Sequence, residues 1–190
     1  MDNKFFTFLD PVLRLIDNGS FYRKPISVLY MVLSVLNLLI PIVVLVQAIN
    51  GQIFDMPGRF IFTFIVLLLV IAVLSWFGAM IWWNRYKKVD AITQANDEFV
   101  AIPIISHLIQ TTGEWLGMWV GVGGFIISLL ASIILGDNIS FVEHLTGLNI
   151  SFFGSFLMII YGFMIVIIFR SFAELYRAIV TIANNTKKLK

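Results

Sequence analysis

Four long apolar runs dominate the chain. They cover residues 26–49, 60–83, 115–135 and 152–169, and each run lacks Asp, Glu, Lys, Arg and His. At a rise of about 1.5 Å per residue, runs of this length approach or exceed the thickness of a hydrocarbon core of about 30 Å. The pattern predicts an all-α membrane protein with four transmembrane helices.

Two shorter segments have an apolar face, one before the first apolar run and one before the third. In segment 10–19 a proline follows an aspartate that can cap a helix, and an Asn-Gly pair marks its end. Segment 103–113 repeats the order of proline, paired aliphatic residues and glycine. We therefore expect one membrane domain, 1–190, made of two hairpins, each preceded by a short interfacial amphipathic helix. The similarity of the two segments suggests a tandem repeat of 1–90 and 91–190, and chance similarity between apolar segments is the alternative.

The third run carries small residues at a spacing of three to four, which lets another helix approach closely. We expect this stripe to be a helix-packing interface, with the fourth run and its Gly154, Ser155 and Gly162 as the default partner. A neighbouring copy or a pore are the other options. The stripe consists of Gly113, Gly117, Gly121, Gly124, Ser128 and Ser132.

The fourth run continues as an amphipathic helix beyond its apolar part. Arg170, Glu174 and Arg177 follow at helical spacing, which predicts an interfacial charge cluster in which Glu174 reaches both arginines. In the first run, Asn37 precedes Pro41 by one turn, which predicts a polar notch or an interhelical hydrogen bond.

Composition and charge placement define the class and the orientation. Hydrophobic residues make up 59% of the chain and charged residues 13%, which excludes an ordinary soluble domain. Of the 13 lysines and arginines, all except Arg59 fall on one side of the four predicted spans. Because cytoplasmic loops are enriched in these residues, we expect a multi-pass protein with cytoplasmic N- and C-termini.

Candidate chemistry is sparse. His107 and His144 fall on opposite predicted sides of the membrane, and the chain has no cysteine. The sequence therefore predicts no catalytic set, no metal site and no cofactor. Thr111-x-x-Glu114 fits a capping box, which gives Glu114 a structural role. The expected partners are the lipid bilayer and either a second copy or another membrane protein, and nothing indicates nucleic acid.

The end of the chain resembles a known group of proteins. Arg170-x-x-x-Glu174, followed by Ile182-Ala183-Asn184-Asn185-Thr186, is similar to the ending of small bacterial inner-membrane proteins grouped as a domain of unknown function. The resemblance covers the last predicted hairpin and implies a bacterial inner-membrane location without implying a mechanism.

Three functions fit these patterns. The leading hypothesis is a non-enzymatic structural or accessory subunit of an inner-membrane assembly. The alternative is a small oligomeric channel or facilitator lined by the glycine stripe of the third span. A lipid-modifying enzyme ranks third, because convergent ionisable groups are missing from the predicted spans.

Overall fold

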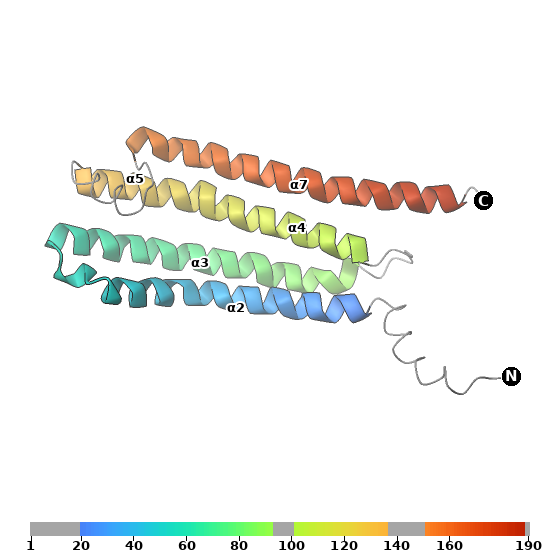
Figure 1. The fold of residues 1–190 in the computed structure, drawn as a ribbon, viewed down its shortest axis with the longest axis horizontal. Helices are drawn as coiled ribbons and strands as arrows, with labels where there is room; N and C mark the ends of the chain where they lie inside the picture. Colours follow the sequence, from blue (N-terminus) through green and yellow to red (C-terminus); the bar gives the residue numbers. More distant parts are fainter. Residues whose placement is uncertain (1–19, 93–100, 137–150, 189–190) are drawn as a thin grey trace, which may run out of the picture.

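Four long helical stretches make up the described part of the chain. The computed structural model describes residues 20–92, 101–136 and 151–188, and within these ranges there is no strand. The elements in chain order are α2 (Ser20–Asn50), the short η1 (Ile53–Asp55), α3 (Gly58–Ile92), α4 (Ala101–Gly117), the π-helical η2 (Met118–Gly123), α5 (Gly124–Leu135) and α7 (Phe152–Lys188) (Figure 1).

Each stretch is long and apolar enough to cross a membrane. Among the described residues, the four candidate spans are Lys24–Asn50, Gly58–Val89, Ala101–Leu135 and Phe152–Thr186. Many of their large apolar side chains are exposed on the bundle surface and few are buried, as expected where lipid rather than protein surrounds a helix. Within the described residues the predicted all-α class is therefore confirmed, with four helices long and apolar enough to span a membrane, which fits a multi-pass membrane protein.

The third stretch corrects one prediction. Helix α4 begins at Ala101 and runs through η2 and α5 without a break, so 103–113 does not form a separate interfacial helix. The Thr111 hydroxyl donates to the His107 carbonyl within α4 at 2.8 Å, so the predicted capping box at Glu114 is wrong as well. Gly113 does not end the helix. It lies against Phe169 of α7, where a side chain would clash. The other predicted interfacial helix, 10–19, lies outside the described residues.

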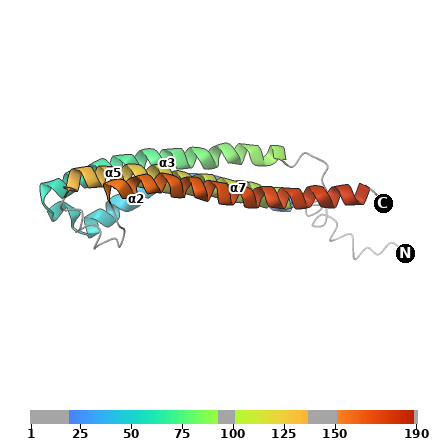
Figure 2. The ribbon, with the colours of Figure 1, turned by 90° about the horizontal axis from the view of Figure 1, so that it is seen from above.

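The helices run side by side along one long axis (Figure 2). Helix α2 packs along α3, and the α4–η2–α5 stretch contacts both α3 and α7. Among the described elements, α7 contacts only α4, η2 and α5, and it forms the outer edge of the molecule in Figure 1. The starts of α2 and α4 and the ends of α3 and α7 gather at one end of the bundle. This end, rich in polar residues, is the predicted cytoplasmic end.

Candidate functional site

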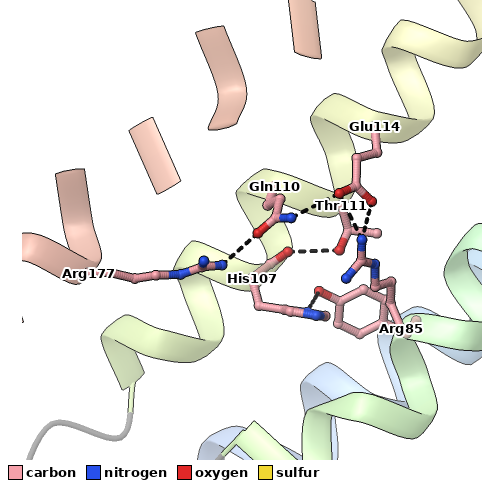
Figure 3. Close-up of polar contacts among 7 residues, drawn as sticks. Arg85, His107, Gln110, Thr111, Glu114 and Arg177 are labelled. Atoms are coloured by element: carbon pink, nitrogen blue, oxygen red, sulfur yellow. Dashed lines mark hydrogen bonds and ion pairs between the residues drawn. The ribbon is translucent and has the colours of Figure 1, made fainter. Parts of the chain in front are cut away.

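Polar side chains from all four stretches meet around α4 near the predicted cytoplasmic end. Arg85 comes from α3 and Arg177 from α7, and both point toward polar residues of α4 (Figure 3). Tyr30 of α2 adds a third contact, with His107. Helix α4 is thus the hub of a polar network that joins the other helices.

An ion pair joins α3 to α4. The Arg85 Nη2 atom donates to Glu114 Oε1 at 2.8 Å and to Oε2 at 2.5 Å. The two side chains are only 24% and 27% exposed, so the pair is shielded from water much more than a surface ion pair. The Gln110 amide donates to Glu114 Oε1 at 2.9 Å and fixes the carboxylate further.

The same glutamine connects this ion pair to α7. Arg177 Nη2 donates to Gln110 Oε1 at 2.6 Å, and Arg177 Nε donates to Ser106 Oγ at 2.9 Å. The Ser106 hydroxyl in turn donates to the carbonyl of Ala173 at 2.7 Å. A continuous chain of polar contacts therefore crosses from α3 through α4 to α7.

A buried aromatic cluster joins α2 to the same region. The Tyr30 hydroxyl and His107 Nδ1 are 2.9 Å apart, and both side chains are buried. The ring of Tyr30 also lies 5.4 Å from that of Trp82, centroid to centroid. His107 Nε2 and Trp82 Nε1 are buried without a hydrogen-bond partner among the described residues. Leu33 and other apolar side chains pack against the cluster, so its surroundings are those of a helix-packing core.

The predicted notch at Asn37 is a junction of three helices. Trp115 Nε1 of α4 donates to Asn37 Oδ1 at 2.7 Å, and the Asn37 amide donates to the Leu33 carbonyl at 2.8 Å. Gly78 of α3 makes room for this contact, since an added Cβ would lie 2.5 Å from Asn37 Oδ1. Pro41 lies one turn further along α2, inside the helix. The Asn37 side chain therefore accepts one hydrogen bond from α4 and donates another within α2.

The predicted stripe of small residues faces α7 over most of its length. A Cβ added to Gly117 would lie 2.8 Å from the carbonyl oxygen of Gly162, and one added to Gly121 would lie 3.2 Å from the Gly162 Cα. Gly124 lies against Met158, and the hydroxyls of Ser128 and Ser155 are 2.9 Å apart. Ser132 lies near the end of α5, where its carbonyl accepts the N–H of Gly136.

The predicted charge cluster on α7 is divided between two faces. Arg170 Nε and Glu174 Oε1 are 3.1 Å apart, and their side chains are 64% and 62% exposed. Arg177 instead turns to Ser106 and Gln110 of α4. The structure thus brings Arg170 and Glu174 together and uses Arg177 for helix packing.

Apolar grooves flank η2 on both sides. One of about 680 Å³ lies between α3 and the η2–α5 stretch, and Asn84 is the single polar residue in its lining. The other, of about 570 Å³, lies between this stretch and α7. Within the described ranges, no three His, Cys, Asp or Glu side chains come together as a metal site would require. Such grooves suit hydrocarbon rather than a polar or charged substrate.

Sequence reasoning missed the Arg85–Glu114 pair, although a signal for it exists. Arg85 follows the predicted second span by two residues, and Glu114 precedes the predicted third span by one. Two opposite charges that flank neighbouring spans on the same side of a membrane lie at the same depth, so they can pair. The Tyr30–His107 contact had no such signal, because it depends on how two helices are rotated.

Comparison with models of protein families, with curated proteins and with solved structures finds no match to this chain. The conclusions about function therefore rest on the residues and their geometry.

Proposed function

We propose that this chain is a non-enzymatic, multi-pass protein of a bacterial inner membrane that serves as a structural or accessory subunit. The observation that carries the proposal is that the polar side chains near the predicted cytoplasmic end bond to one another. Arg85, Glu114, Gln110 and Arg177 bond to one another across three helices, and none of them lines the apolar grooves beside η2. A network of this kind fixes the relative positions of helices, which is what a scaffold requires.

The proposal includes an arrangement as two hairpins with cytoplasmic N- and C-termini. The asymmetry of lysine and arginine supports this orientation. The Arg170-x-x-x-Glu174 spacing and the Ile182-Ala183-Asn184-Asn185-Thr186 ending support a place among the small inner-membrane proteins that the chain resembles.

An oligomeric channel lined by the glycine stripe receives less support. Gly113, Gly117 and Gly121 lie against α7 of the same chain, where added side chains would meet Phe169, Val166 and Gly162. Gly117 and Gly121 also line the groove toward α7, so a pore between copies would have to form along a surface that α7 already partly covers. A lipid-modifying enzyme also receives less support, because Glu114 is paired with Arg85 and the His107 ring is buried against Tyr30, away from the apolar grooves.

Two measurements test the accessory role against the channel. Mild detergent extraction of native membranes, followed by native mass spectrometry, should reveal the 21.6 kDa chain bound to at least one different membrane protein. Vesicles that contain the purified chain should release a trapped ion no faster than empty vesicles. Release that Gly121→Leu abolishes and Val122→Leu preserves would favour the channel instead, because Val122 is exposed on the outer surface.

A further inference from the structure

Helix α7 carries a second apolar stripe that no described helix covers. The stripe follows alternating steps of three and four, the spacing of a coiled-coil seam. Its four later members, Phe172, Leu175, Ile179 and Ile182, are 54%, 57%, 51% and 65% exposed. We call it the outer stripe, and it consists of Ile165, Ile168, Phe172, Leu175, Ile179 and Ile182.

From Ile168 on, the members of the outer stripe are exposed on the surface of α7. The residues of α7 that contact α4 include Phe169, Ala173 and Arg177, which lie on the other side of the helix. Glu174 and Thr181 are also off the stripe, on the polar side. Helix α7 therefore has one face committed to α4 and a second apolar face that is available to a partner.

Hydrocarbon can cover only the first part of this stripe. The exposed Arg170–Glu174 ion pair follows an apolar run of about 27 Å, residues 152–169, so we expect it at the membrane–water boundary. Ile182 lies 12 residues beyond Arg170, or about 18 Å along the axis. Ser106 of α4 is level with Ala173, to whose carbonyl it donates. Since α4 begins at Ala101, five residues before Ser106, Ile179 and Ile182 project past its start. Exposed apolar residues on a projecting helix mark an interaction surface.

We propose that the outer stripe pairs in parallel with the outer stripe of a second copy, as a two-stranded coiled coil. Two copies in one bilayer share one orientation, so identical residues lie at the same height. Each residue of the stripe then packs against the same residue of the other copy. The positions that flank the stripe are uncharged, including Ser171, Tyr176 and Ala178, so two copies meet without repulsion between like charges. Ile179 and Leu175 occupy the a and d positions where β-branched and leucine side chains favour two strands, while the other d positions carry Ile168 and Ile182.

This inference deepens the proposed accessory role and rests on it for the shared orientation of the copies. Because the chain has no cysteine of its own, single cysteines provide a clean test. Leu175→Cys, Ile179→Cys and Ile182→Cys in native membranes should each give a disulfide-linked dimer on oxidation. Thr181→Cys, on the polar side of the same turn, is the matched control and should give several-fold less dimer.

A second measurement separates lost pairing from lost folding. The double variant Leu175→Glu/Ile179→Glu should shift the purified chain from dimer to monomer, while its thermal unfolding as a monomer stays near that of Thr181→Glu. Equal crosslinking at Thr181→Cys, no dimer at any stripe position, or crosslinks only to a different protein would each overturn the pairing of two copies. A heteromeric complex without stripe crosslinks would overturn the pairing and leave the accessory role standing. A stripe-linked dimer with no other subunit would support the pairing and contradict the accessory role.

Discussion

Arg85 and Glu114 show what a charge at the edge of a membrane requires. An unpaired ion near hydrocarbon is costly, and a partner with good geometry offsets much of that cost. Arg85 contacts both carboxylate oxygens of Glu114, and Gln110 donates to one of them. Arg170 and Glu174 also pair, but on an exposed surface where water screens the attraction. The two ion pairs are therefore expected to contribute very differently to stability.

Glu114→Gln should lower the free energy of unfolding by about 1–3 kcal/mol, because it leaves the half-buried Arg85 guanidinium without its carboxylate. Glu174→Gln is the matched control and should cost less than about 1 kcal/mol, since its side chain is 62% exposed. Thermal unfolding of both variants in the same detergent measures the difference. Equal losses would mean that the Arg85–Glu114 pair stabilises the fold no more than a surface ion pair does.

At the scale of elements, the α4–η2–α5 stretch organises the others. Its small residues face α7, its Glu114 faces α3 and its His107 faces α2. In a membrane, an apolar helix gains no hydrophobic free energy by exchanging lipid for another helix. Helices therefore associate through close packing, which needs small residues at the contact. The π-helical η2 lies at the point of closest approach, where Gly121 contacts Gly162. The contact between this stretch and α7 is therefore the interface most sensitive to side-chain size.

Gly121→Leu should destabilise the monomer by about 1–3 kcal/mol, because a larger side chain at this contact must push α7 away. Val122→Leu, one residue further on an exposed surface, is the control and should change little. The melting temperature of the detergent-solubilised monomer is the measurement. An unchanged value for Gly121→Leu would show that the stripe packs weakly against α7 and would reopen the pore hypothesis.

At the scale of the whole molecule, orientation determines which surfaces meet the cytoplasm. The end of α7 lies at the same end of the bundle as the starts of α2 and α4, and η1 lies at the other (Figure 1). Lysine and arginine gather at the first end, which predicts that it is cytoplasmic.

Asp55→Cys in η1 should react with a membrane-impermeant thiol reagent in intact cells. Lys88→Cys should react only after the cells are opened, because Lys88 lies near the end of α3 and Asp55 lies just before its start. Both positions are exposed, so burial does not protect either from the reagent. Reaction of Lys88→Cys in intact cells would contradict the predicted orientation.

The sequence by itself determined the number and nature of the long helices. The length of an apolar run and the absence of charge within it are properties of one segment, and a bilayer converts them directly into a spanning helix. Small residues at helical spacing likewise predicted where another helix could approach, and the structure places Gly162 of α7 at Gly117 and Gly121. These features needed no knowledge of which helices are neighbours.

Only the tertiary structure decided which polar groups meet. The pairing of Tyr30 with His107 and the turn of Arg177 toward α4 depend on the rotation and height of separate helices, which local pattern does not encode. The same cause explains the wrong prediction at Gly113. A glycine before an apolar run is typical of a helix end, but here α4 continues through Gly113, whose missing side chain makes room for Phe169 of α7.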